Sequence, residues 1–170
     1  MAPIIFVLGG ARSGKSRFAE ERTGAFAAKK KVYLATAECR DEEMESRIAL
    51  HRARRGSDWK TVETPHRLAE TLSAEASDDR AILVDCLTLW LTNRMLADAD
   101  LEAEYESLIA GLKAAAGPVV LVSNEVGLSI VPENALARRF RDQAGRLNQK
   151  VAALADEAWF VAAGLPLRLK

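Results

Sequence analysis

The sequence contains little cysteine. Among its 170 residues only Cys39 and Cys86 carry a thiol, and they form no Cys-x-x-Cys pair and no other metal-binding spacing. Two cysteines are too few for the disulfide framework that stabilises small secreted domains. We therefore expect both thiols to be reduced, as is usual in a cytoplasmic protein.

The sequence also lacks a net charge and a long hydrophobic run. The 24 Lys and Arg residues balance the 24 Asp and Glu residues, so bulk electrostatics favour neither nucleic acid nor an anionic membrane as a partner. No apolar stretch approaches the ~18 residues of a spanning helix, and no basic segment precedes a hydrophobic one at the N-terminus. These absences predict a cytoplasmic protein with no membrane span. The chain length fits a single domain, residues 1–170.

The sequence does contain a complete P-loop. Residues 9–16 match the pattern G-x-x-x-x-G-K-[ST] without a gap, and they are Gly9, Gly10, Ala11, Arg12, Ser13, Gly14, Lys15 and Ser16. An apolar, β-branched run at 4–8 precedes the motif and a helical pattern at 16–30 follows it. The alternative is a glycine-rich turn before an ordinary helix, and the two flanks argue against it. The loop amides and the helix N-terminus would then bind phosphates, with Lys15 at the β- and γ-phosphates and the Ser16 hydroxyl on Mg²⁺.

The rest of the chain predicts an α/β fold with a mainly parallel sheet. Apolar runs at 32–36, 81–85 and 119–122 predict strands that are separated by helical segments, and such a chain folds into right-handed βαβ units. Shorter strands are expected at 59–63, 158–162 and 165–169, with a possible hairpin around 164–166. Helices are expected at 65–76 with Thr64 as N-cap, at 87–96 as a buried helix or a subunit contact, at 101–116, and after 134.

Polar residues at the carboxyl ends of the predicted strands are candidates for the site, because open α/β sheets bind ligands there. Asp85 ends an apolar strand, which is the position of a Walker B carboxylate that holds Mg²⁺. The alternative role for Asp85 is to cap the N-terminus of the next helix. Asn124 and Glu125 follow another buried strand, where a turn would also favour asparagine.

A highly charged helix is predicted at residues 41–55. Its acidic residues lie in the first turn and its basic residues in the last, which suits the helix dipole. His51 lies on one face of this helix, and Arg47 and Arg55 lie four residues before and after it. The arginines are either a solvated helix end or the cations that a transferring phosphoryl or nucleotidyl group requires.

Several segments together resemble the bifunctional adenosylcobinamide kinase/adenosylcobinamide-phosphate guanylyltransferase family. The resemblance covers nearly the whole chain in order. It is carried by the P-loop, Arg47-Ile48-x-x-His51-Arg52, Trp59-x-Thr61-x-Glu63-x-Pro65, Ser123-Asn124-Glu125-Val126-Gly127, Ile130-Val131-Pro132-Glu133 and Phe140-Arg141-Asp142-x-Ala144-Gly145-x-x-Asn148-Gln149.

The resemblance implies a RecA-like P-loop NTPase fold, a trimer, and two transfers in cobalamin biosynthesis. ATP or GTP phosphorylates the aminopropanol hydroxyl of adenosylcobinamide, and GMP is then moved from GTP onto the resulting adenosylcobinamide-phosphate. The family's guanylylated histidine matches His51. Its guanine-nucleotide contacts match the P-loop and a second set of residues, namely Ala35, Thr36, Ala37, Arg52, Ala53, Arg54, Arg55, Glu63 and Asp85.

Two other classes of protein compete with this interpretation. A simple P-loop small-molecule kinase would use the arginines of residues 47–55 as a lid on the γ-phosphate and would form no covalent intermediate. A nucleotide switch or nucleic-acid motor is disfavoured, because the sequence has no Asn-Lys-x-Asp motif, no net charge and a short chain.

Overall fold

The structure is a computed structural model that describes residues 2–38 and 58–170. The described strands are β1 (Ile4–Gly9), β2 (Lys30–Ala35), β3 (Trp59–Glu63), β4 (Arg80–Asp85), β5 (Val119–Asn124), β6 (Glu157–Ala162) and β7 (Leu165–Arg168). The described helices are α1 (Lys15–Gly24), α3 (Leu68–Glu75), α4 (Leu87–Leu96), α5 (Leu101–Ala114) and α6 (Ala135–Leu154). None of these helices is long and apolar enough to cross a bilayer.

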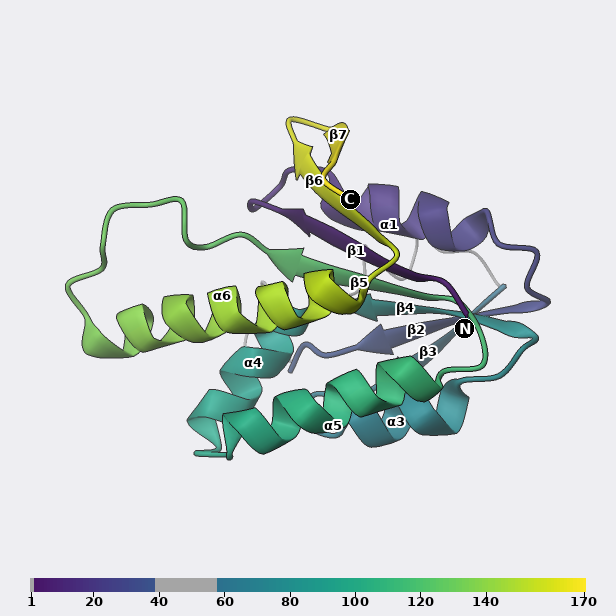
Figure 1. The fold of residues 1–170 in the computed structure, drawn as a ribbon, viewed down its shortest axis with the longest axis horizontal. Helices are drawn as coiled ribbons and strands as arrows, with labels where there is room; N and C mark the ends of the chain where they lie inside the picture. Colours follow the sequence, from purple (N-terminus) through teal and green to yellow (C-terminus); the bar gives the residue numbers. More distant parts are fainter. Residues whose placement is uncertain (1, 39–57) are drawn as a thin grey trace.

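The seven described strands form one sheet in the order β3-β2-β4-β5-β1-β6-β7 (Figure 1). All neighbouring strands are parallel except β7, which pairs antiparallel with β6. The carboxyl ends of β1 and β5 lie side by side, because Gly9 is in register with Asn124. The predicted fold class, a mainly parallel sheet flanked by helices, is confirmed.

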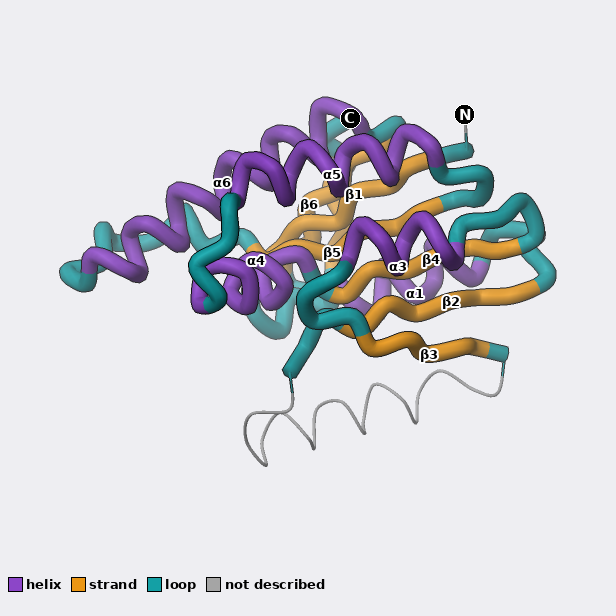
Figure 2. The backbone as a smooth tube through the Cα atoms, turned by 90° about the horizontal axis from the view of Figure 1, so that it is seen from below, coloured by secondary structure: helices purple, strands orange, loops and turns teal. Residues whose placement is uncertain are grey.

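Helices cover the two faces of the sheet unequally, as the two views show (Figures 1 and 2). Ile4 and Phe6 of β1 pack with residues of α3, α4, α5 and α6, whereas Ile5 and Val7 face α1. This alternation follows from the two-residue period of a strand. Both faces are buried, which explains why the central strands are nearly continuous apolar runs.

The predicted helix at 16–30 is too long. The structure ends α1 at Gly24, and β2 already begins at Lys30, whose amide donates to the Asp79 carbonyl at 3.1 Å. Phe26 packs against the core on the α1 side, so the connection is held by burial rather than by further helical turns. The run Lys29 to Lys31 is therefore not a helix C-terminus.

The predicted start of the next helix is also wrong. The N-cap of α3 is Arg67, and Thr64 is buried with its hydroxyl 2.9 Å from that of Thr71. The Thr64 amide donates to the Ala35 carbonyl at 2.7 Å, which extends the β2–β3 pairing by one residue. Thr64 thus serves the sheet and not the helix end.

The apolar segment 87–96 is a buried helix. Leu87, Trp90 and Leu91 of α4 are fully buried in the chain's own core. Of the two interpretations left open by the sequence, burial within the chain is therefore confirmed for these residues. The predicted hairpin at the end of the chain is also confirmed, since β6 and β7 pair across a turn in which Ala163 and Gly164 both have positive φ.

Candidate functional site: the P-loop cavity

The P-loop folds as a compact turn between β1 and α1. Gly14 is the N-cap of α1 with φ of 93°, and Arg12 also has a positive φ. The Ser13 amide donates to the Gly10 carbonyl, and the Phe18 amide donates to the Gly14 carbonyl at 3.1 Å. Only glycine adopts the Gly14 conformation without steric cost, which explains one invariant position of the pattern. The turn brings the start of α1, with its free amide groups, to the carboxyl end of β1.

Lys15 is buried within this turn. Its ammonium donates to the Gly10 carbonyl at 3.1 Å. Burial lowers the pKa of Lys15 from its ordinary value, and the neighbouring Cys86 and Asp85 oppose that shift. A desolvated ammonium favours an anionic ligand, because phosphate oxygens would compensate the charge that water no longer solvates.

A cavity of about 770 Å³ opens in front of the P-loop. Residues 11–17 form one wall, α4 contributes Thr88, Leu89 and Thr92, and Asn124, Glu125 and Val126 follow the end of β5. Phe140 of α6 completes the lining. The predicted P-loop and the two candidate residues Asn124 and Glu125 are thus brought together at one site.

Asp85 lies at the carboxyl end of β4, close enough to Lys15 for their charges to interact. Its carboxylate accepts a 3.0 Å hydrogen bond from the Tyr33 hydroxyl. The N-cap of α4 is Cys86, and no side chain caps that helix. The helix-capping interpretation of Asp85 is therefore wrong, and its carboxylate lies near the Lys15 ammonium of the P-loop.

The described residues include oxygen donors that suit a divalent cation, although they do not form a complete metal site. In residues 2–38 and 58–170, no group of three or more His, Cys, Asp and Glu side chains could hold a metal ion. Mg²⁺ usually takes only one or two protein oxygens and completes its shell with water and phosphate. The hydroxyl of Ser16 and the carboxylate of Asp85 are oxygen donors of this kind, so the residues fit Mg²⁺ bound together with a nucleotide.

The cavity residues Thr88 and Thr92 were missed from the sequence. The Asn124 side-chain amide donates to the Thr88 hydroxyl at 2.8 Å, which ties the end of β5 to the first turn of α4. The Thr88 hydroxyl also lies 3.0 Å from the buried Cys86 thiol. The available signal was two threonines four residues apart in a mainly apolar helix, a spacing that places both on one face.

Thr36 is committed to the protein's own framework. Its hydroxyl donates to the Cys86 carbonyl at 2.7 Å and accepts from the Cys86 amide at 2.8 Å. Its amide donates to the Asp85 carbonyl, and its carbonyl accepts from the Asn93 side chain at 2.8 Å. These bonds fix the carboxyl ends of β2 and β4 relative to each other, beside the P-loop cavity.

The other candidate nucleotide contacts lie farther along the same edge of the sheet. Ala35 ends β2 and Glu63 ends β3, which are three and four strand positions from β1. At a strand spacing of about 4.8 Å these positions are about 14 and 19 Å from the P-loop strand. A phosphate at the P-loop would therefore lie far from Ala35 and Glu63, and only the nucleoside end of an extended nucleotide would approach them. His51 and its neighbours Arg52, Ala53, Arg54 and Arg55 lie outside the described residues.

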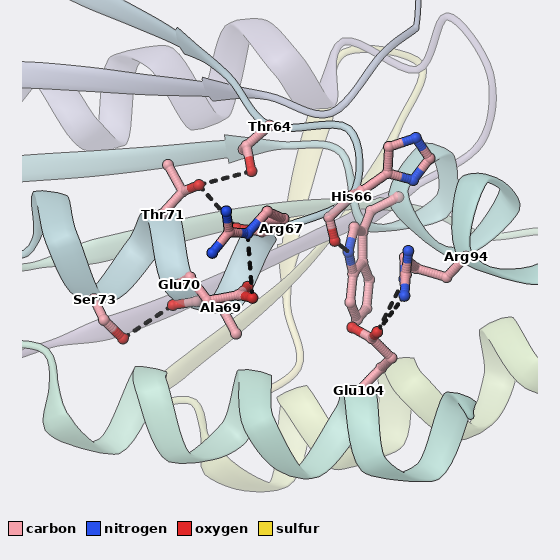
Figure 3. Close-up of polar contacts among 10 residues, drawn as sticks. Thr64, His66, Arg67, Ala69, Glu70, Thr71, Ser73, Arg94 and Glu104 are labelled. Carbon is pink, nitrogen blue, oxygen red and sulfur yellow. Dashed lines mark hydrogen bonds and ion pairs between the residues drawn. The ribbon is translucent and has the colours of Figure 1, made fainter. Parts of the chain in front are cut away.

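His66 lies before α3 and its side chain is 40% exposed. Its imidazole Nε2 lies 2.6 Å from the Glu38 carboxylate. Its backbone carbonyl accepts a 3.2 Å hydrogen bond from the Trp90 indole (Figure 3). On the same side of the sheet, Arg94 of α4 contacts Glu104 of α5 at 2.6 Å. These contacts anchor α4, the helix that forms one wall of the cavity.

The comparison with known families decides the chain's relationship. The family model described as cobinamide kinase / cobinamide phosphate guanyltransferase, or CobU, matches residues 5–169. The chain belongs to the CobU family. The resemblance that the motifs carried is thereby confirmed over almost the full sequence.

Curated relatives of this CobU family member match it end to end. The chain is 51% identical over 166 residues to the bifunctional adenosylcobalamin biosynthesis protein CobP of Pseudomonas aeruginosa, covering 96% of this chain and 95% of the relative. It is 42% identical over 182 residues to the bifunctional adenosylcobalamin biosynthesis protein CobU of Salmonella typhimurium, covering 98% and 99%. The CobU protein of Escherichia coli matches at the same identity and coverage.

Solved structures show the fold of this CobU family member. The type III secretion ATPase EscN of enteropathogenic E. coli superposes with a TM-score of 0.60 at 16% identity, over 95% of this chain and 43% of that chain. The flagellar accessory protein FlaH of Methanocaldococcus jannaschii superposes with a TM-score of 0.57 at 12% identity, over 99% and 78%. At these identities the likeness concerns architecture alone, and it confirms the predicted P-loop NTPase fold.

Proposed function

We propose that this chain carries out both transfers that name its family. ATP or GTP phosphorylates the aminopropanol hydroxyl of adenosylcobinamide, and GMP from GTP is then transferred onto adenosylcobinamide-phosphate, which gives adenosylcobinamide-GDP and pyrophosphate. The observation that carries the proposal is a complete P-loop cavity in a chain that matches the family along residues 5–169. The function belongs to adenosylcobalamin biosynthesis, as the relatives' names state for them.

The cavity residues suit a triphosphate in both transfers. The loop amides and the buried Lys15 would hold the β- and γ-phosphates, while Ser16 and Asp85 would hold Mg²⁺, which neutralises phosphate charge when bound. In the kinase step these groups stabilise the transferring γ-phosphoryl group. In the guanylyl step the same groups stabilise the leaving pyrophosphate. One phosphate site therefore supports reaction at either phosphorus.

The second transfer requires a nucleophile that attacks the α-phosphorus. We assign it to His51, because this residue matches the guanylylated histidine of the family that the chain resembles. An ordinary imidazole has a pKa of about 6.5, so it is largely neutral and nucleophilic near pH 7. The bond from the imidazole nitrogen to phosphorus forms as the bond to the pyrophosphate oxygen breaks. The acceptor phosphate then displaces the imidazole and takes the GMP.

The remaining contacts of the nucleotide complete the proposal. Arg52, Arg54 and Arg55 would supply cations near the α-phosphate, and Ala53 accompanies them on the same segment. Ala35, Ala37 and Glu63 would face the nucleoside, which the strand spacing permits, whereas Thr36 is fully buried and would hold the strand ends behind them. We also propose one domain over residues 1–170, a homotrimer and a cytoplasmic location. The chain length supports the single domain, the family resemblance supports the trimer, and the low cysteine content supports the location.

The alternative of a simple kinase without a covalent intermediate is not favoured by the family match. The test is to incubate the protein with adenosylcobinamide, Mg²⁺ and either ATP alone or ATP with GTP, and to analyse the corrinoid products by mass spectrometry. We expect adenosylcobinamide-phosphate with ATP alone and adenosylcobinamide-GDP when GTP is added. Phosphorylation that never proceeds to the GDP derivative would leave only the kinase.

A further inference from the structure

A second hollow adjoins the P-loop cavity. It has a volume of about 280 Å³ and is formed by Thr92, Met95 and Leu96 of α4 together with Leu136, Ala137 and Phe140 of α6. We call it the α4–α6 groove. Thr92 and Phe140 line the P-loop cavity as well, so the two hollows share a wall. The two helices are in contact beside the carboxyl ends of the central strands (Figure 1).

The α4–α6 groove is apolar. Among the described residues that line it there is no charged side chain, and Asn134 uses its side-chain oxygen to cap α6 by accepting from the Ala137 amide at 3.0 Å. Leu96 and Leu136 are nevertheless 55% and 52% exposed. Burial of this surface against an apolar partner is favourable, whereas the surface has no charged group that would bind a phosphate.

The groove lies at a defined distance from the phosphate site along α4. Thr88 lies in the P-loop cavity, Thr92 is shared, and Met95 lies in the groove. Seven residues of helix separate Thr88 from Met95, which corresponds to about 10 Å. A ligand that occupies both hollows must therefore place a polar end near Thr88 and an apolar body near Met95, about 10 Å along the helix.

The loop between β5 and α6 continues this apolar surface. It runs from Val126, which lines the cavity, to Asn134, which lines the groove. Between them Leu128, Ile130 and Val131 are exposed, Ile130 by 93%. The loop that connects the two hollows therefore has exposed apolar side chains along its length.

We propose that the α4–α6 groove binds an apolar edge of the acceptor's corrin macrocycle, so that the aminopropanol arm reaches the phosphate end of the P-loop cavity. This inference rests on the proposed function and assigns the acceptor site within it. A corrin ring has methyl-bearing edges and carries its reacting hydroxyl on a flexible side arm, which matches an apolar groove joined to a phosphate site. The groove volume holds one edge of the ring, and the exposed loop residues contact the rest. A second copy of the chain is the competing occupant.

The test uses two substitutions of opposite charge in the full-length protein. Leu136→Asp places an acid in the first turn of α6 and Leu96→Lys places a base in the last turn of α4, so both respect the helix dipoles and preserve folding. Leu167→Asp on β7 is the matched control, because Leu167 is 61% exposed and lines neither hollow. The measurements are the KM for adenosylcobinamide, the KM for the nucleotide, and the mass of the assembly in solution.

We expect both groove variants to raise the KM for adenosylcobinamide about tenfold, with the nucleotide KM and the assembly mass unchanged, and the control to behave as wild type. A rise with only one sign of charge would indicate an electrostatic effect and contradict an apolar contact. An unchanged acceptor KM in both variants, or an altered assembly mass, would overturn the proposal. Failure of the proposed function itself is distinct, because the wild-type protein would then turn over no corrinoid.

Discussion

The Gly164 amide donates a 2.8 Å hydrogen bond to the Ser13 carbonyl, so the turn of the C-terminal hairpin is tied to the P-loop. Gly14 and Gly164 also approach closely, since a Cβ on Gly14 would lie 3.1 Å from the Gly164 Cα. At the start of the loop, a Cβ on Gly9 would lie 2.5 Å from the Val161 carbonyl oxygen of β6. The shape of the phosphate-binding loop therefore depends on the last strands of the chain as well as on its own glycines.

Gly9→Ala is expected to damage the loop because the added methyl group meets backbone. It would force Val161 and β1 apart and lower the free energy of unfolding by about 1–3 kcal/mol, with at least a tenfold loss of nucleotide affinity. Gly24→Ala is the control, because a Cβ there meets nothing within 4 Å. Denaturant unfolding and calorimetric titration with GTP measure the two effects. Equal stability of the two variants would contradict the close packing of Gly9 against β6.

Asp85→Asn is expected to reduce kcat of the kinase step by about 10²-fold without unfolding the protein. The amide is isosteric but removes the charge that would hold Mg²⁺ and that interacts with Lys15. Tyr33→Phe removes only the 3.0 Å hydrogen bond to the carboxylate and should reduce kcat far less. Steady-state rates at several Mg²⁺ concentrations test this. A similar kcat for Asp85→Asn and wild type would remove Asp85 from the metal site.

Cys86 is expected to make stability depend on pH in the alkaline range. Burial raises the pKa of Cys86 from 9.0 to about 11, and Asp85 adds to the shift. Between pH 9 and 11 the unfolded chain binds fewer protons than the folded chain, so the free energy of unfolding falls as pH rises, by about 2–3 kcal/mol. Denaturant midpoints of Cys86→Ala and of wild type across this window give the difference. Parallel pH slopes would contradict the burial of a protonated thiol.

The fold could be predicted where strong local patterns agreed with their surroundings. The strand at 59–63 and the hairpin at the end of the chain were found because alternation and turn residues coincide there with real pairing. The prediction for 16–30 was wrong because a helical pattern does not show where the following strand begins to pair. Lys30 already belongs to β2, where it pairs with β4. Thr64 and Pro65 are residue types that favour a helix start. In the structure, however, the Thr64 amide donates a hydrogen bond to the Ala35 carbonyl and extends the sheet.

The candidate site divides in the same way. The place of the P-loop at the cavity could be predicted because its motif is specific, and that of Asn124 and Glu125 because their strand ends at the same edge of the sheet. Thr88, Thr92 and Phe140 could not, since only the packing of α4 and α6 brings them to the cavity. The role of Thr36 as a clamp on Cys86 depends on hydrogen bonds between residues 50 apart, which no local pattern reveals.

The central claim is that one P-loop site serves reaction at two different phosphorus atoms. The most direct test is to incubate the protein with Mg²⁺ and GTP labelled at either the α- or the γ-phosphate, without acceptor, and to measure label retained after denaturation. The account predicts that the α-label is retained in an acid-labile, alkali-stable bond and that His51→Ala abolishes it. Retention of no α-label by the wild-type protein, or full retention by His51→Ala, would contradict it.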